Sequence, residues 1–317
     1  MANRFITNAE DLITSHEQTR AGFIEAALEK NRKAKPYIEA ASTLKIMASR
    51  ANNPRELLDL PQIRQSLLAA SGLSDKSLAY FTDEDKTIAI KKLIEEFLIP
   101  AGEHFIDELV YRFLLIKGDS LGGTMRNFVG AVAKMKLKRR ILSVLSTMNI
   151  PYGILKKTNK KRNLWDMMSY ERDYDNADEV SAISWSIDGN SKILFFDAKI
   201  PIVGKNVDIC LYRGDKNDFN GGAIINDNNR AIMFGELKGG IDPAGADEHW
   251  KTGNTALIRI RSAFKDYNIK TAFVGAAIER SMANEIWEQL CNGTLSNAAN
   301  ITCEEQFEDF SEWVVKL

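Results

Sequence analysis

The sequence contains few of the residues that build disulfide frameworks and zinc sites. Among its 317 residues there are only three cysteines, Cys210, Cys291 and Cys303. Their spacings fit neither a disulfide framework nor a CxxC metal site, and Cys210 lies in a segment that predicts a buried strand. A reducing cytoplasm is therefore the expected location.

Long hydrophobic runs are absent as well. No apolar stretch approaches the roughly 18 residues that a membrane-spanning helix needs, and the first residues, MANRFITNAEDL, contain no charged segment followed by an apolar one. We therefore expect a protein that is neither exported nor anchored in a membrane. With 44% hydrophobic residues, the chain can bury a full core and has room for one large domain or two smaller ones.

Acidic residues are missing from one long segment, Ser120 to Trp165, although the whole chain has a net charge of -1. The segment carries eleven basic residues, so the remainder of the chain sums to -12. The eleven are Arg126, Lys134, Lys136, Lys138, Arg139, Arg140, Lys156, Lys157, Lys160, Lys161 and Arg162. A local basic patch on a near-neutral protein is typical of a specific DNA-binding protein, because phosphate contacts supply much of the affinity. The alternative interpretation is a solvated helix face.

The first third of the chain predicts a series of helices. Thr82 and Asp85 form a capping-box pattern, and the apolar residues that follow share one face of a helix that ends at Pro100. The string KGDSLGG, residues 117–123, predicts a joint that leads into a basic helix from about Thr124. The expected division is a mainly helical domain at 1–117 and a second domain at 118–317.

From about Ser181 the pattern changes to short strands that are rich in Ile, Val and Phe and bounded by Gly, Asn and Asp. Residues 215–229, rich in Asn, Asp and Gly, predict a hairpin loop. Helices and one further buried strand follow the run AIMFGELK. This order predicts an α/β fold, in which a mixed β-sheet is flanked by helices, with an additional N-terminal all-helical domain.

Two of these predicted strands carry acidic residues and a lysine in a D…ExK arrangement. Asp208 lies in KNVDICLY, and Glu236 and Lys238 lie at the end of IMFGELKGG. Because side chains two apart in a strand share a side, Glu236 and Lys238 face one site, which Asp208 can complete from the neighbouring strand. Two carboxylates suit Mg²⁺, and an ammonium beside them can stabilise charge on a phosphate. The bare pattern also arises by chance, but charged residues in an apolar run are costly unless something pairs with them.

Longer strings extend this pattern over most of the chain. They are RAGFIEAALEKN from Arg20, GDSLGGTMRN from Gly118, KNVDICL from Lys205, GELKGGIDPAGADEHWKTGNTAL from Gly235 and GAAIERSMANEIW from Gly275. With these strings, the chain resembles the AvaI/BsoBI group of type II restriction endonucleases, which have the PD-(D/E)xK nuclease fold. Val207 stands where the general pattern of that fold often has Pro.

The resemblance implies a homodimeric, Mg²⁺-dependent endonuclease. Such an enzyme cuts both strands of duplex DNA at the degenerate palindrome 5′-CYCGRG-3′, where Y is a pyrimidine and R a purine, and leaves 5′-phosphate ends. The resemblance also implies a helical domain that helps to surround the DNA. A companion DNA methyltransferase is expected in the host without being a stable subunit, and no membrane partner is expected.

The resemblance assigns catalytic and metal-binding roles to individual residues. Asp208 and Glu236 would hold the metal together with the Leu237 carbonyl, and Lys238 would position or stabilise the attacking water. A histidine near the scissile phosphate falls on His249, in the first turn of the helix after the ExK strand. A neutral imidazole there could take a proton from the attacking water. The alternative is a histidine that only makes a structural hydrogen bond.

Four residues are candidates for DNA contacts. The resemblance places base contacts on Lys205 and Asp242, and also on Lys76 in SGLSDKS. Lysine can pair with guanine and aspartate with cytosine in the major groove. The alternatives are a surface lysine at a strand end and, for Asp242 before Pro, a turn residue. Arg126 opens the predicted basic helix, where its side chain and the helix N-terminal amides together could bind phosphate.

Two other functions are compatible with D…ExK alone. One is a repair or junction nuclease of the same fold, against which the long string from Gly235 argues. The other is a DNA-binding protein with a decayed nuclease site, which the intact Asp208, Glu236 and Lys238 disfavour. A restriction endonuclease is therefore the preferred prediction.

Overall fold

The computed structural model describes residues 3–74, 76–167 and 169–317, with six side chains omitted. These belong to Arg126, Asn127, Lys161, Arg162, Tyr170 and Glu171. The chain divides into two compact units, one made of Met1–Phe23 with Phe128–Leu317 and the other of Ile24–Asn127. Within the described part of the chain, no helix is long and apolar enough to span a membrane.

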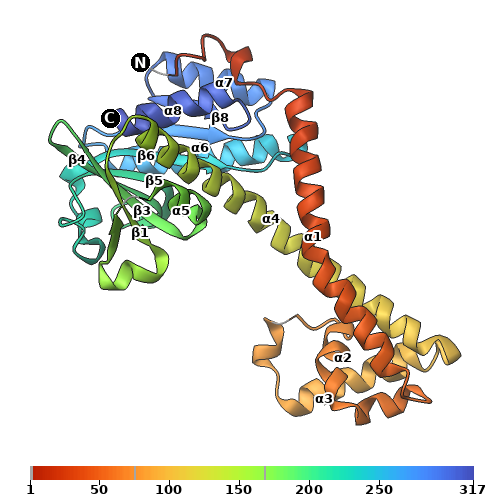
Figure 1. Cartoon of the computed structure of the whole chain (residues 1–317). Coiled ribbons are helices and arrows are strands. Elements are labelled where there is room, and N and C mark those ends of the chain that lie inside the picture. The colour runs from red at the N-terminus through yellow and green to blue at the C-terminus, as the bar shows by residue number, and fades with distance from the viewer. Residues whose placement is uncertain (1–2, 75, 168) are drawn as a thin grey trace. The chain divides into compact units, whose positions relative to one another are not determined.

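The unit Ile24–Asn127 is helical, as its sequence pattern predicts (Figure 1). It contains parts of α1 (His16–Ala48) and α4 (Phe105–Thr147), and all of α2 (Arg64–Ala70) and α3 (Asp83–Leu93). A π-helical turn, Ile94–Leu98, extends α3. The predicted capping box is present, because the Thr82 side chain accepts from the Asp85 N–H and the Asp85 side chain accepts from the Thr82 N–H. The core of this unit includes Leu44, Leu67, Ile90, Leu109 and Phe113.

The predicted joint at residues 117–123 is wrong, because α4 continues through it as one helix. Leu121 and Met125 are both buried and lie one turn apart, so a helical burial pattern persists across the two glycines. Each glycine costs only about 1 kcal/mol relative to alanine in a helix. The unit boundary falls between Asn127 and Phe128, within the same helix. A DNA-surrounding role for the helical unit stays a prediction.

The other unit is built on an eight-stranded mixed sheet. Its strands are β1 (Tyr152–Lys156), β2 (Trp165–Met167), β3 (Val180–Ile187), β4 (Asn190–Ile200), β5 (Lys205–Arg213), β6 (Ala231–Lys238), β7 (Lys270–Gly275) and β8 (Asn297–Asn300). The order across the sheet is β2-β1-β3-β4-β5-β6-β7-β8. Neighbours are antiparallel from β2 to β6, whereas β6, β7 and β8 are parallel. The predicted α/β class with a mixed sheet is confirmed.

Helices cover both faces of this sheet. The C-terminal part of α4 and α8 (Glu304–Lys316) pack on one face, where Leu137 and Phe310 belong to the same core as Leu237 of β6. Helix α6 (Ala246–Ala263) packs on the other, where the Phe234 and Phe264 rings lie 4.6 Å apart between centroids. Helix α7 (Arg280–Cys291) lies beside α6, and α5 (Tyr170–Asp175) precedes β3. The predicted loop at residues 215–229 connects antiparallel β5 and β6.

Candidate active site

The site begins where β5 and β6 separate. Their ladder ends with the pair Ile209 and Gly235, and the Asp208 side chain fills the opening beyond it. One Asp208 carboxylate oxygen accepts a hydrogen bond of 2.9 Å from the backbone N–H of Leu237. In an extended strand, the N–H and C=O of one residue point to the same neighbouring strand. The Leu237 carbonyl therefore also faces the Asp208 side of β6.

Glu236 and Lys238 lie on one side of β6, as strand alternation predicts. The Lys238 Nζ donates to the Glu236 carboxylate over 3.5 Å, while the Leu237 side chain is buried in the opposite core. The Lys238 stem passes over Gly253 of α6, where a Cβ would come within 3.3 Å of the Lys238 Cε. The glycine therefore leaves the lysine room to reach the carboxylate.

Burial and charge together favour a bound cation at these carboxylates. Burial, followed by repulsion from Asp208, raises the pKa of the Glu236 carboxyl to about 7, although Lys238 and Lys134 oppose the shift. Near neutral pH the charged form of Glu236 is therefore disfavoured, and a divalent cation would stabilise it. No group of three or more His, Cys, Asp and Glu side chains suited to a metal occurs among the described residues. A hard cation would thus rely on two carboxylates, a backbone carbonyl and water, a donor set that fits Mg²⁺.

A second lysine reaches the site from α4. The Lys134 Nζ lies 3.0 Å from the second Asp208 carboxylate oxygen and also contacts Asp197 of β4. Helix α4 can approach this closely because Gly239 follows β6: a Cβ there would lie 2.5 Å from the Cβ of Ala133. Burial lowers the pKa of the Lys134 ammonium, but attraction to Asp208 and the hydrogen bonds with both aspartates raise it overall. The ammonium therefore stays charged between the two aspartates.

An inversion of the strand pattern brings Asp197 to the same place. In a regular strand, residues 195 and 198 face opposite sides, yet Phe195 and Ala198 both belong to the core on the α6 side. Between them, Asp197 adopts φ 53°, in the left-handed region, and the flanking pairs of β4 and β5 place it opposite Asp208. The inversion turns Asp197 toward α4, where it meets Lys134.

His249 lies in the first turn of α6, beside the loop that follows β6. A Cβ on Gly240 would come within 2.5 Å of the His249 Nε2, so the half-buried imidazole rests against the Gly240 backbone. Gly253, which borders the Lys238 stem, stands one turn further along the same face of α6. His249 and Lys238 are thus presented by one face of α6 and the adjoining end of β6.

A methyl group at Gly240 tests whether the position of this imidazole matters for catalysis. Gly240→Ala is expected to displace the His249 ring and slow DNA cleavage by up to about 10²-fold, the lower range for a positioned general base. The matched control is Gly245→Ala, whose Cβ would meet the same nitrogen at an ordinary 3.5 Å. Single-turnover cleavage rates measure both variants. Equal rates for Gly240→Ala and the unaltered protein, with the imidazole displaced in a crystal structure, would remove His249 from the chemistry.

The candidate base-reading residues differ in their surroundings. Lys205 is exposed at the first position of β5, three residues before Asp208. Asp242 is exposed and caps the short helix Pro243–Gly245, because its side chain accepts from the Ala244 N–H at 3.0 Å. The turn-residue interpretation of Asp242 is therefore confirmed. A base contact through the second carboxylate oxygen stays a prediction.

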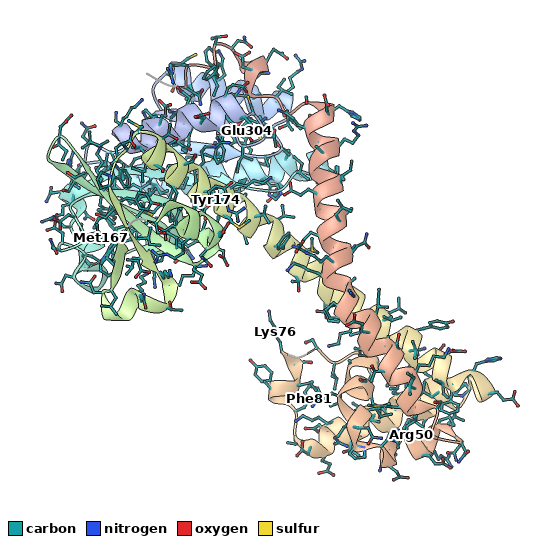
Figure 2. All side chains as sticks on the ribbon, viewed as in Figure 1. Arg50, Lys76, Phe81, Met167, Tyr174 and Glu304 are labelled. Carbon is teal, nitrogen blue, oxygen red and sulfur yellow. The ribbon has the colours of Figure 1, made fainter. Side chains whose placement is uncertain are left out.

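The other two DNA candidates belong to the helical unit. Lys76 is exposed, just before a short 3-10 helix that begins at Ser77, and Figure 2 shows its side chain extending from the surface of that unit. Arg126 lies inside α4 and not at a helix start, so the helix N-terminal amides proposed to assist it are not free there. The Arg126 side chain lies outside the described part of the structure.

The acid-free basic stretch is not a continuous DNA-facing patch. Lys138 is only 4% exposed, and burial, followed by repulsion from Lys157, lowers the pKa of its ammonium to about 8. Arg139 donates to the backbone carbonyl of Tyr174 and covers its ring, and Arg140 pairs with Glu304. Tyr174 and Glu304 are marked in Figure 2. The patch interpretation is therefore wrong for the buried Lys138, whereas a DNA contact by Arg139 or Arg140 stays a prediction.

Among the described side chains of the connection between β1 and β2, two basic ones are exposed. Lys157 and Lys160 lie in the 3-10 turn Lys157–Arg162. This turn belongs to the edge of the sheet, because β2 is its outermost strand.

Two carboxylates and a lysine thus lie at the separating ends of neighbouring strands, in a mixed sheet covered by helices. A family profile described as "Restriction endonuclease BsobI" matches residues 2–317. The chain belongs to this family of restriction endonucleases, and it is accordingly a site-specific endonuclease.

Individual relatives agree with the family assignment. The chain is 49% identical over 314 residues to the type II restriction enzyme BsoBI of Geobacillus stearothermophilus, which covers 98% of this chain and 97% of the relative. It is 48% identical over 314 residues to the type II restriction enzyme AvaI of a Nostoc species, with 98% of both chains covered. Similarity therefore extends over both units and is not confined to the D…ExK strands.

Proposed function

We propose that the chain is a type II restriction endonuclease of the PD-(D/E)xK fold that hydrolyses duplex DNA at 5′-CYCGRG-3′ with Mg²⁺ and leaves 5′-phosphate ends. The observation that carries the proposal is the gathering of Asp208, Glu236 and Lys238 at the point where β5 and β6 separate. Membership in the BsobI restriction endonuclease family supplies the reaction class.

Each residue of the site has a role that its geometry supports. Asp208 and Glu236 would hold Mg²⁺ with the Leu237 carbonyl, and the bound ion would neutralise charge on the phosphate and activate water. Asp208 is fixed for this task by the Leu237 N–H. Lys238 would orient the attacking water and stabilise the charge that develops on the phosphate. The His249 imidazole would accept a proton from that water.

The symmetry of the palindrome supports a homodimer of this chain. Both strands of the duplex must be cut at equivalent positions, whereas each chain carries one D…ExK site. A homodimer with two-fold symmetry places one site at each scissile bond. A companion methyltransferase that protects the host DNA, and a cytoplasmic location, belong to the same proposal.

Digestion of three DNA substrates with Mg²⁺ tests the function. Linear duplex DNA that contains CYCGRG is expected to yield discrete fragments, whereas the same duplex without the site stays intact. Preferential cleavage of a branched duplex would favour a junction nuclease, and binding without cleavage would favour a decayed site. Either of the last two outcomes contradicts the proposal.

Base recognition is separable from catalysis at Lys205 and Asp242. If Lys205 pairs with guanine and Asp242 with cytosine, replacement of either by Ala lowers the ratio of cognate to noncognate affinity. The expected loss corresponds to about 1–3 kcal/mol of binding free energy per contact. The affinities are measured in Ca²⁺, which prevents cutting. Because Asp242 also caps a helix, Asp242→Asn keeps that hydrogen bond and is the better variant for this residue. Slower cleavage with an unchanged ratio would defeat the base-reading assignment.

Lys76→Ala in the helical unit is tested by the same ratio.

A further inference from the structure

Lys134 holds a position that no D…ExK pattern requires. Its ammonium lies between two carboxylates on neighbouring strands, at 3.0 Å from Asp208 and in closer contact with Asp197. Lys134 contacts Oδ1 of Asp208, whereas Oδ2 accepts the hydrogen bond from the Leu237 N–H. A cation that approaches Asp208 therefore finds both carboxylate oxygens already engaged.

Exposure falls steadily from Asp197 inward. The side chains are 46% exposed for Asp197, 28% for Lys134 and 18% for Asp208. A small rotation of the flexible lysine stem about its contact with Asp197 would move the ammonium toward water and away from the more buried carboxylate. The same rotation would free one Asp208 oxygen for a metal.

We propose that Asp197 is a positioning residue that retains the Lys134 ammonium while a divalent cation binds Asp208. In the metal-free protein, the two aspartates share the lysine, which neutralises charge at the site. On cation binding, Asp197 alone keeps it, so the lysine does not compete with the metal. This inference rests on the proposed metal-binding role of Asp208 and extends it to a residue outside the D…ExK motif.

The backbone at Asp197 suits this assignment. A non-glycine residue in the left-handed region costs stability, and Asn and Asp are the side chains that tolerate it best. The inversion at φ 53° directs the carboxylate toward α4. Asp197→Asn therefore removes the charge without adding backbone strain, which makes it the sharpest variant. Lys134→Met removes the ammonium and keeps most of the apolar stem.

Calcium titration of the protein bound to its cognate duplex, followed by calorimetry, tests the inference without requiring cleavage. Asp197→Asn should weaken Ca²⁺ binding by on the order of tenfold, because the lysine then stays on Asp208 and opposes the cation at close range. Lys134→Met should bind Ca²⁺ at least as tightly as the unaltered protein. Adding Asp197→Asn to Lys134→Met should have little further effect, since Asp197 acts through the lysine.

Two results would overturn the inference. Equal weakening by Asp197→Asn in both backgrounds would mean that Asp197 acts on the cation directly, and weaker binding by Lys134→Met would mean that the lysine supports the metal. Lys134→Arg keeps the positive charge and should keep the sensitivity to Asp197→Asn. Asp208→Asn is the control for the site itself: if it binds Ca²⁺ like the unaltered protein, the proposed metal site fails as well. Thermal unfolding establishes that every variant is folded.

Discussion

Asp208→Asn or Glu236→Gln is expected to lower the rate of DNA cleavage by about 10³-fold or more, because each removes a charged metal ligand whose contribution is worth several kcal/mol. Specific binding to the cognate duplex should persist, since neither carboxylate is assigned to base recognition. Asp208→Asn is preferable to Ala because the amide oxygen can still accept from the Leu237 N–H. Single-turnover rates and binding in Ca²⁺ measure the two properties.

The control for these variants is a surface carboxylate that does not belong to the D…ExK site. Glu288 is exposed on α7, and Glu288→Gln should leave cleavage unchanged. Asp208 and Glu236 lose their assignment if either variant cuts at the normal rate in saturating Mg²⁺. Loss of specific binding together with cleavage would instead indicate that the fold of the site has changed.

Glu236→Gln is also expected to make the metal-free protein more stable above neutral pH. The folded-state pKa of Glu236, about 7, lies above its ordinary value of 4.5, so the folded protein binds this proton more tightly than the unfolded chain does. Stability therefore decreases as pH rises from about 4.5 to about 7, and the full penalty applies above that window. Its size is on the order of 3 kcal/mol. Glutamine keeps the shape and removes the charge.

Chemical unfolding in EDTA at low and high pH checks this stability effect. At pH 8, above the folded-state pKa of about 7, Glu236→Gln should have the higher free energy of unfolding. At pH 4, below the ordinary carboxyl pKa of 4.5, the two proteins should unfold at similar denaturant concentrations. A variant that is less stable at both pH values would contradict the burial argument. The expected combination, a Glu236→Gln variant that is inactive but more stable at pH 8, would indicate that the carboxylate is retained for function at a cost in stability.

The carboxylates of D…ExK were predictable from the sequence because their placement depends on local rules. Strand alternation alone puts Glu236 and Lys238 on one side of β6, and the apolar runs around Asp208 predict the adjacent strand. The helix that carries His249 follows from its amphipathic pattern after residue 246. These elements lie close together in sequence, so few long-range contacts had to be known.

Lys134 and Asp197 could not be predicted in the same way. Lys134 reaches the site only because α4 docks against Gly239, a contact between distant segments. Asp197 reaches the site because its left-handed φ inverts the alternation of β4. Regular strand alternation would instead place its side chain on the face of the sheet that α6 covers. Sequence alone suggested a joint in α4 at residues 117–123 because glycine is a common helix breaker, whereas burial of Leu121 overrides that preference.

The most direct test of the account is to digest, with Mg²⁺, a DNA library that contains every sequence allowed by CYCGRG together with near-cognate variants, and to sequence the cut ends. We expect cuts in both strands at symmetric positions within CYCGRG alone, with 5′-phosphate ends, and none when Glu236→Gln replaces the unaltered protein. Cuts scattered over unrelated sequences, or cutting that persists in Glu236→Gln, would contradict it.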